Sequence, residues 1–285
     1  VSNSYSTGAV TGTGDYAGGL IGWNYEGDIA TSYGTGSVSG KSYTGGLAGY
    51  NYSGSVSNSY STGAVTGTGA YAGGLIGWNY EGDIANSYST GSVRGRSMVG
   101  GLVGDNYSGN IKNSFWDITT SGQTTSAGGR GMTTADFMNK ANFTSARAAN
   151  GNVNPGWNFS NTWYMIDGNT RPFMRMEYST NITNAHQLQL MALNLGASYT
   201  LANNIDMSEL KQASGMWNTS TGFVPIGDSS TKFTGTFDGL GHTITGLYIN
   251  RPATNYGGLF GYTQSSSVIQ NVGLLNANIT GQDYV

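Results

Sequence analysis

The sequence predicts an all-β fold, a parallel β-helix in the form of a three-sided solenoid with about 27 residues per rung. Three observations predict it: a repeated segment, apolar residues at regular intervals, and glycines between them. The segment at residues 18–29 returns at 45–56, 73–84 and 100–111, in steps of 27, 28 and 27 residues. A repeat of this length is typical of structural units that stack on one another.

Apolar residues recur at intervals that suit strands. Leu20, Ile29, Val38 and Leu47 follow one another nine residues apart, and three such intervals complete one rung. Amphipathic helices place apolar residues every three or four positions, so this spacing does not predict helices. Coiling the chain so that equivalent residues lie about 4.8 Å apart gives each strand a hydrogen-bonded neighbour above and below. We therefore expect three short strands per rung and one interior column of leucines. That column comprises Leu20, Leu47, Leu75 and Leu102.

Glycines recur between the apolar positions. Gly36 and Gly40 are the two examples in one rung, and equivalent glycines lie in the neighbouring rungs. Glycine adopts positive φ more readily than any other residue. We therefore expect these glycines to form the left-handed corners of the solenoid.

Composition narrows the range of partners and chemistries. The 285 residues include 47 glycines and no cysteine, only 9% are charged, and the net charge is −3. Lysines and arginines are scattered and form no basic patch, so we expect no nucleic-acid partner. The lack of cysteine excludes disulfides and thiolate metal sites. No apolar run is long enough to predict a membrane span.

Three regions follow one another along the chain. Residues 1–117 carry the regular repeats of a first β-helix array. Residues 118–178 lose the period and contain two tryptophans, which predicts a connecting or capping segment with one short helix at 133–141. Residues 179–285 begin a second array, opened by a short helix at 184–194. Because the chain starts in mid-rung, we expect it to be a piece of a longer array.

The repeats are too alike to predict an enzyme pocket. Residues 1–40 and 56–95 are identical at 36 of 40 positions. A catalytic site needs unlike side chains that converge, and no Ser-His-Asp, metal or phosphate-loop pattern is present. Paired acids such as Glu26 and Asp28 are interpreted as solvated turn charges. We therefore expect no enzyme, no catalytic, cofactor-binding or metal-binding residues, and no cofactor.

Polar and aromatic side chains form columns that follow the repeat. One corner of each rung carries an asparagine, and we expect the amides to hydrogen-bond along the axis as a structural ladder. A ligand-binding row is the alternative. The ladder comprises Asn24, Asn51, Asn79 and Asn106. A tyrosine column that includes Tyr33 and Tyr60 is expected to stack between rungs, with a carbohydrate-binding platform as the alternative.

A further column is expected on the outside. If Leu20 points inward, strict alternation along a strand sends Ile21 and Trp23 outward. The aromatic positions of this column form a stripe for surface contact, comprising Trp23, Tyr50 and Trp78. Exposed patches of this kind mark interaction sites. The expected partners are an extracellular or host-surface glycan or protein, or neighbouring copies in a filament; packing beneath an adjacent segment is the alternative.

The repeat resembles the GLUG motif, named for its Gly-Leu-any-Gly core. The core is Gly19-Leu20-Ile21-Gly22 here, and it has four counterparts, the last at 258–261. This resemblance implies a right-handed β-helix in a large secreted or surface-attached bacterial protein, similar to filamentous-haemagglutinin-like adhesins. It implies no catalytic residues. The leading hypothesis is a structural and adhesive module of a stiff rod or filament, extracellular or at the cell surface. The alternative is a carbohydrate-binding or polysaccharide-degrading β-helix protein.

Overall fold

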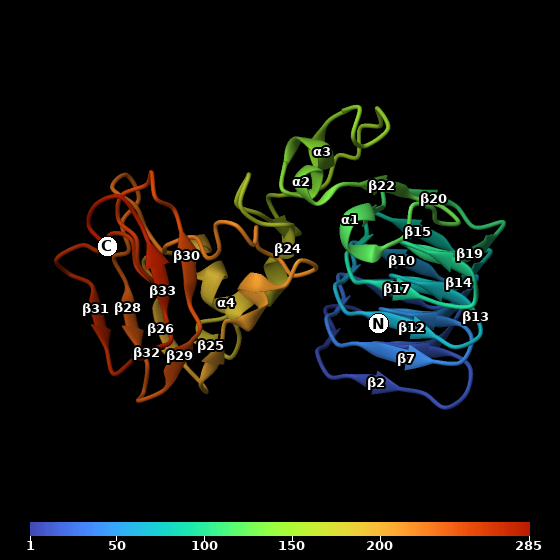
Figure 1. The fold of residues 1–285 in the computed structure, drawn as a ribbon, viewed down its shortest axis with the longest axis horizontal. Coiled ribbons are helices and arrows are strands. Elements are labelled where there is room, and N and C mark those ends of the chain that lie inside the picture. Colours follow the sequence, from blue (N-terminus) through green and yellow to red (C-terminus); the bar gives the residue numbers. More distant parts are fainter. The chain divides into compact units, whose positions relative to one another are not determined.

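The computed structural model describes residues 1–285, which form two units, Val1–Thr162 and Trp163–Val285. The boundary between the units falls inside the expected connecting segment, 118–178. Residues 118–162 belong to the first unit, and the remainder of that segment begins the second. Both units are built mainly from short parallel strands (Figure 1).

Five stacks of parallel strands build the first unit, and each complete rung contributes one strand to every stack. The β5 stack contains β5 (Asp28–Ala30), β10 (Ser55–Ser57), β15 (Asp83–Ala85) and β20 (Ile111–Lys112). The β6 stack contains β1 (Tyr5–Ser6), β6 (Tyr33–Gly34), β11 (Tyr60–Ser61), β16 (Tyr88–Ser89), β21 (Phe115–Asp117) and β22 (Arg130–Met132). The β7 stack contains β2 (Val10–Thr11), β7 (Val38–Gly40), β12 (Val65–Gly67) and β17 (Val93–Arg94). The β8 stack contains β3 (Ala17–Gly18), β8 (Thr44–Gly45), β13 (Ala70–Gly73) and β18 (Ser97–Gly100). The β9 stack contains β4 (Ile21–Tyr25), β9 (Ala48–Tyr52), β14 (Ile76–Tyr80) and β19 (Val103–Tyr107).

Equivalent residues of successive rungs pair in register, which confirms the parallel β-helix. Val56 of β10 lies opposite Ile29 on one side and Ile84 on the other. The rung nevertheless contains five strands instead of the three that nine-residue spacing predicts. The reason is local, because left-handed residues divide the sides: Glu26 (φ 52°) separates β4 from β5, and Thr31 (φ 49°) separates β5 from β6.

The glycines serve packing and do not form the left-handed corners, which corrects the expectation for Gly36 and Gly40. Neither glycine has positive φ, and the left-handed corners fall on other residue types, such as Glu26 and Thr31. A Cβ atom on Gly63 would lie 1.9 Å from the carbonyl oxygen of Gly36 in the next rung. Glycine is therefore required here because the backbones of neighbouring rungs come too close for any side chain.

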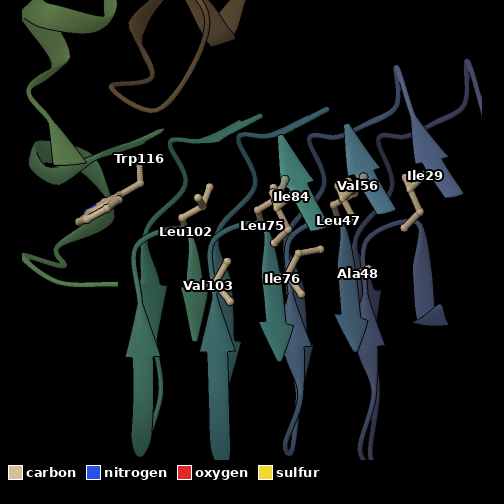
Figure 2. Packing of buried hydrophobic residues seen from close by; sticks show 10 residues of the cluster. All are labelled: Ile29, Leu47, Ala48, Val56, Leu75, Ile76, Ile84, Leu102, Val103 and Trp116. Carbon is tan, nitrogen blue, oxygen red and sulfur yellow. The ribbon is translucent and has the colours of Figure 1, made fainter. Parts of the chain in front are cut away.

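The interior column of leucines is confirmed. Leu47, Leu75 and Leu102 are fully buried, and Leu20 packs against the same cluster from the first rung. Figure 2 shows the three buried leucines, and the isoleucines and valine of the β5 stack, aligned along the axis, with Trp116 beyond the last rung. Burying such aliphatic side chains contributes roughly 1.5–3 kcal/mol for each one.

The column of Ile21 also lies inside, which corrects the predicted outward direction. Its counterparts Ala48, Ile76 and Val103 are fully buried and join the leucine cluster. Alternation between faces holds only within one continuous strand. Leu20 sits at a bend before β4 begins, so Leu20 and Ile21 both reach the interior from either side of that bend.

A cap closes the last rung of the first unit, as expected for the end of a solenoid. Helix α1 (Ile118–Ser121) and strand β22 follow the last rung, and β22 adds one more parallel strand beside β21. The hydroxyl oxygen of Ser126 accepts hydrogen bonds from the backbone N–H groups of Leu102 (3.2 Å) and Val103 (2.9 Å). The cap thus satisfies strand edges that would otherwise be open to pairing.

The expected helix at 133–141 is two shorter helices, α2 (Thr134–Phe137) and α3 (Ala141–Thr144). Thr133 is the N-cap of α2 and forms a capping box with Asp136. The two helices and the following loop place Phe143 and Trp157 against the last rings of the tyrosine column.

The second unit is a less regular parallel β structure with three stacks. The first contains β25 (Asn181–Ile182), β26 (Ser198–Leu201), β28 (Thr236–Asp238) and β31 (Val268–Gln270). The second contains β27 (Ile205–Asp206), β29 (Thr243–Thr245) and β32 (Gly273–Leu275), and the third contains β30 (Tyr248–Asn250) and β33 (Asn278–Thr280). An antiparallel pair, β23 (Trp163–Tyr164) and β24 (Phe173–Met174), precedes them.

A helical segment lies within the expected range 184–194, after the antiparallel pair, the 3-10 helix η1 (Arg175–Glu177) and strand β25. Helix α4 (Ala185–Leu190) begins after its N-cap Asn184, whose side chain accepts a hydrogen bond from the N–H of Gln187. Three short 3-10 helices complete the unit: η1 (Arg175–Glu177), η2 (Met191–Leu193) and η3 (Ser208–Lys211).

Candidate functional site

The predicted contact residues form one column of stacked rings on the β9 stack. Trp23, Tyr50 and Trp78 come from β4, β9 and β14, which pair in register. Ring centroids lie 5.4 Å apart between Trp23 and Tyr50, and 4.8 Å apart between Tyr50 and Trp78. The structure therefore brings all three together as neighbours along the axis.

Only the first of these rings is openly exposed. Trp23 is 51% exposed, whereas Tyr50 is 6% exposed and Trp78 is half-buried. The exterior position predicted for Tyr50 is thus wrong. A neighbouring column, comprising Tyr16, Tyr43 and Tyr71, covers this side with centroid distances to the predicted column of 5.2–5.9 Å. Burial raises the pKa of Tyr50 to about 12.

A second column of tyrosines lies on the other side of the predicted one. We name it the outer tyrosine column, and it comprises Tyr25, Tyr52, Tyr80 and Tyr107. Consecutive centroids are 5.1, 5.1 and 4.9 Å apart with interplanar angles of 1°, 3° and 15°. Each predicted residue meets a member of this column edge-on, as Trp78 meets Tyr80 at 5.6 Å. Together the three columns form a surface that we name the aromatic flank.

Stacking decides which parts of the aromatic flank a partner can reach. Within a column, each inner ring has a neighbouring ring on both faces, so only ring edges and hydroxyls remain for contact. A sugar cannot stack on the faces of these inner rings, because neighbouring rings already cover them. Carboxylates border the flank, since Asp15 precedes Tyr16 and Glu26 follows Tyr25. The flank therefore offers hydroxyl and carboxylate groups to a partner that makes hydrogen bonds.

The asparagines form a continuous hydrogen-bonded ladder inside one corner. Each Nδ2 donates to the Oδ1 of the next asparagine at 2.7 Å, from Asn24 to Asn51, Asn79 and Asn106 in turn. Each Nδ2 also donates to the carbonyl three residues later, as Asn51 does to Gly54 at 2.9 Å. Asn51 and Asn79 are fully buried. The amides thus form hydrogen bonds with one another and with backbone carbonyls, as expected for a structural ladder.

The inner tyrosine column stacks in the same way but is enclosed beyond its first ring, Tyr5, which is 57% exposed. It comprises Tyr5, Tyr33, Tyr60 and Tyr88, with centroids 5.0–5.1 Å apart. Tyr60 and Tyr88 are fully buried, and Trp157 of the cap covers the end of the column. Tyr33, Tyr60 and Tyr88 therefore present no face for carbohydrate binding.

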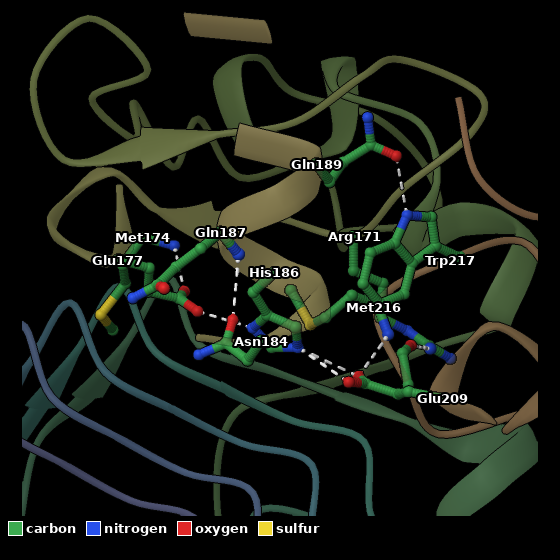
Figure 3. A network of polar contacts seen from close by, with 11 residues as sticks. Arg171, Met174, Glu177, Asn184, His186, Gln187, Gln189, Glu209, Met216 and Trp217 are labelled. Carbon is green, nitrogen blue, oxygen red and sulfur yellow. Dashed lines mark hydrogen bonds and ion pairs between the residues drawn. The ribbon is translucent and has the colours of Figure 1, made fainter. Parts of the chain in front are cut away.

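The second unit contains a buried ionic cluster that the sequence analysis did not anticipate (Figure 3). His186 on α4 contacts Glu177 of η1 through Nδ1 at 2.6 Å, and Glu209 of η3 through Nε2 at 3.0 Å. Arg171 is fully buried nearby and donates to the carbonyls of Gly215 and Ala213. The cluster ties three short helices and the loop at 213–216 together.

The imidazole of His186 is held in its charged form. Burial alone would lower the pKa of His186, but the carboxylates of Glu209 and Glu177 raise it to about 10. Burial would raise the pKa of Glu209, yet the His186 cation and the N–H of Met216 lower it. The two carboxylates approach opposite nitrogens of one ring, so the three groups do not converge on a single point where a metal ion would sit.

One shallow hollow of about 540 Å³ lies beside the β7 stack. Glycine, serine and threonine residues line it, and Lys41 is its only charged group. Most glycoside hydrolases use a pair of carboxyl groups that face each other, and no carboxyl group lines this hollow. The acids of the turns are separated along the axis, because Ser55 stands between Asp28 and Asp83 and donates a hydrogen bond to Asp28.

Comparison with known proteins locates the repeats. The family described as the GLUG motif matches residues 40–66 and 68–94. GLUG repeats are therefore present in the first unit. No solved structure matches the chain significantly, and no helix is both long and apolar enough to cross a lipid bilayer.

Two similar proteins match about a third of the chain each. Halomucin of Haloquadratum walsbyi is 44% identical over 91 residues, which is 32% of this chain and 1% of halomucin. A protein of Evansella cellulosilytica described as a Gly-rich membrane protein is 41% identical over 85 residues, 30% of this chain and 9% of that protein. The chain thus spans only a small part of the length of either relative.

Sequence reasoning missed two of the three columns of the aromatic flank. The signal was present, since an Asn-Tyr pair recurs at Asn24-Tyr25 and Asn51-Tyr52 with the same period as the leucines. No pattern in the sequence predicts the ionic cluster of the second unit. His186 and Glu209 are 23 residues apart with no repeat to relate them, so only the fold brings them together.

Proposed function

We propose that this chain is a non-catalytic structural and adhesive segment of a surface-attached or secreted protein, in which the GLUG rungs form a stiff extracellular rod. The observation that carries the proposal is the unbroken register of the five stacks in the first unit. Every internal strand has backbone hydrogen bonds to a strand above and below, and the asparagine ladder adds side-chain bonds along the same axis. Such an array resists bending and compression.

The similar proteins support the extracellular setting. One is named halomucin and the other is described as a membrane protein. A solenoid gains length in proportion to the number of rungs, at about 4.8 Å for each. A long protein that carries many such rungs would hold other surfaces at a distance from the cell, which suits the adhesin-like role.

We further propose that contact with partners occurs along the aromatic flank. Its rings are rigid and its hydroxyls recur once per rung, so a partner with repeated hydrogen-bonding groups would meet the same surface several times. Exposed Trp23, Tyr25 and Tyr107 supply the largest accessible apolar area of this face. An extracellular glycan or protein bound along the ring edges, or a neighbouring copy, fits this surface.

Electron microscopy of the full chain together with binding assays tests the proposal. The first unit should appear as a rod of constant width, and the chain should bind extracellular glycans or cell surfaces. Replacing Tyr25 and Tyr107 with serine should weaken binding, whereas replacing exposed Ser37 and partly exposed Ser92 with alanine should not. Turnover of any polysaccharide, or binding that is indifferent to the aromatic flank, would contradict it.

A further inference from the structure

The outer tyrosine column brings phenol rings from four successive rungs into contact at the surface. Tyr25 and Tyr107 are 62% and 54% exposed, and Tyr52 and Tyr80 are partly exposed between them. Neighbouring rings are nearly parallel and about 5 Å apart, with the chain positions 27 or 28 residues apart. The fold therefore holds side chains that are distant in sequence in a persistent stack.

The inner tyrosine column has the same geometry without the access. Its centroids are 5.0–5.1 Å apart and its planes differ by 3–9°, yet Tyr60 and Tyr88 have no exposed surface. The two stacks therefore differ in exposure to solvent, except at Tyr5 of the first rung, which is 57% exposed. A third stack, comprising Tyr16, Tyr43 and Tyr71 with centroids 4.8 Å apart, is also partly exposed. A dissolved reagent can therefore reach the phenols of the outer column but not those of Tyr60 and Tyr88.

Carboxylates stand beside two phenols of the outer column. The carboxylate of Glu26 raises the pKa of Tyr25, and that of Glu81 raises the pKa of Tyr80. Both phenols are therefore protonated and neutral at physiological pH. A phenol that loses an electron also loses its proton, and a neighbouring carboxylate accepts that proton directly.

We propose that the outer tyrosine column is a site of oxidative cross-linking, in which a haem peroxidase with hydrogen peroxide joins tyrosines of neighbouring rungs as dityrosine. Two adjacent phenols each give one electron to the oxidant and one proton to a carboxylate or to water. The two radicals then form one carbon–carbon bond between ring positions next to the hydroxyls. The hydrogens on the two coupled ring carbons then move as protons to the two oxygens, which restores both phenols. The two protons and two electrons released in the first step reduce one hydrogen peroxide to two waters.

Stacking favours this coupling over coupling between separate molecules. Two groups held in contact react as if at very high local concentration, which can reach 10⁵ M or more for well-oriented pairs. Exposed side chains at the surface can tilt toward one another, because no packed layer lies outside them. The product is a covalent staple across one turn of the solenoid. Such a staple removes freedom from the unfolded chain and stabilises the rod as disulfides do in other proteins.

The test is oxidation of the full chain by peroxidase and hydrogen peroxide in dilute solution. Dityrosine fluorescence should appear while the chain stays monomeric on a denaturing gel. Mass spectrometry of peptides should identify links between Tyr25 and Tyr52, Tyr52 and Tyr80, or Tyr80 and Tyr107, each with the loss of two hydrogens. Links confined to other tyrosines, or links only between molecules, would overturn the proposal.

Two matched double variants isolate the stack. Tyr52→Phe with Tyr80→Phe leaves Tyr25 and Tyr107 three rungs apart, so dityrosine within the outer tyrosine column should be lost. Tyr60→Phe with Tyr88→Phe removes the same number of hydroxyls from the inner column and should leave the yield unchanged. Circular dichroism of each variant confirms that the β-helix is intact. An equal yield from the wild-type chain and the first variant refutes the site, and it leaves the proposed rod and adhesion function untouched.

Discussion

The two units bury polar groups in opposite ways. The first unit repeats neutral asparagines in a ladder, whereas the second unit buries the ions of Arg171, Glu177, His186 and Glu209 once. The period explains the difference. A residue that recurs in every rung meets its own copies at about 4.8 Å, where like charges repel and neutral amides can pair. Charged side chains are therefore buried only in regions without a repeat, where no equivalent charge lies in the neighbouring rung.

The largest expected effect comes from His186→Ala in the second unit. The substitution removes the cation that pairs with the buried carboxylate of Glu177 and the largely buried carboxylate of Glu209, and we expect a loss of about 3–5 kcal/mol in unfolding free energy. Hydrogen exchange followed by mass spectrometry would locate the loss in peptides of 163–285. His242→Ala, at a position where the side chain joins no such cluster, is the control. Equal effects of the two variants would show that the cluster contributes nothing.

The next effect tests the neutral ladder through Asn51→Ala. This change removes the donor to Gly54 and Asn79 and the acceptor of Asn24. Unsatisfied buried groups cost roughly 1–3 kcal/mol, so we expect the first unit to lose about 2–3 kcal/mol. Exposed Asn110→Ala is the matched control. Thermal unfolding of both variants measures the difference, and a loss spread over both units would contradict the assignment.

A third expected result is that the stability of the second unit depends on pH and that of the first unit does not. The pKa of His186 is raised from 6.5 to about 10, so its contribution to stability is complete below pH 6.5 and is lost as the pH rises toward 10. The pKa of Glu209 is lowered from 4.5, so its contribution is lost as the pH falls below that value. Stability of the second unit should therefore be greatest between about pH 4.5 and 6.5.

The first unit provides the control within the same chain. Both histidines lie in the second unit. The unfolding free energy of the first unit, measured by hydrogen exchange, should therefore change little between pH 6.5 and 9. Exchange rates need correction for the intrinsic effect of pH on each amide. A parallel loss in both units over this range would mean that His186 is not responsible.

The smallest effect concerns a left-handed corner. Thr31 and Asn86 occupy equivalent positions of the duplicated unit, and both have φ of 49°. A β-branched residue is strained there, whereas asparagine adopts this conformation more easily. We expect Thr31→Asn to stabilise the first unit by about 1 kcal/mol, and Asn86→Thr to destabilise it similarly. Chemical denaturation measures both, and a change of the same sign in the two variants would exclude the explanation.

The sequence was sufficient to predict the parts of the fold that repeat. The nine-residue intervals located the columns of Leu47, Val56 and Val65, because a stacked array copies each environment in every rung. The five strands were not predictable in the same way. They depend on left-handed φ at Glu26 and Thr31, which are residue types that give no signal of that conformation.

The candidate site was predicted in outline only. Trp23, Tyr50 and Trp78 stack as neighbours, but the burial of Tyr50 follows from Tyr43, which approaches from a different strand stack. Distances between stacks do not follow from a period along the chain. The ionic cluster around His186 was missed for a related reason, since its members come from separate helices of a region without repeats.

The near identity of residues 1–40 and 56–95 affects how the number of rungs can evolve. Recombination between such copies inserts or deletes 55 residues at once. The new junction joins surfaces that already match, so ladders and aromatic columns continue without a defect. The length of the array can therefore evolve in steps of two rungs, roughly 10 Å each, with no intermediate that misfolds.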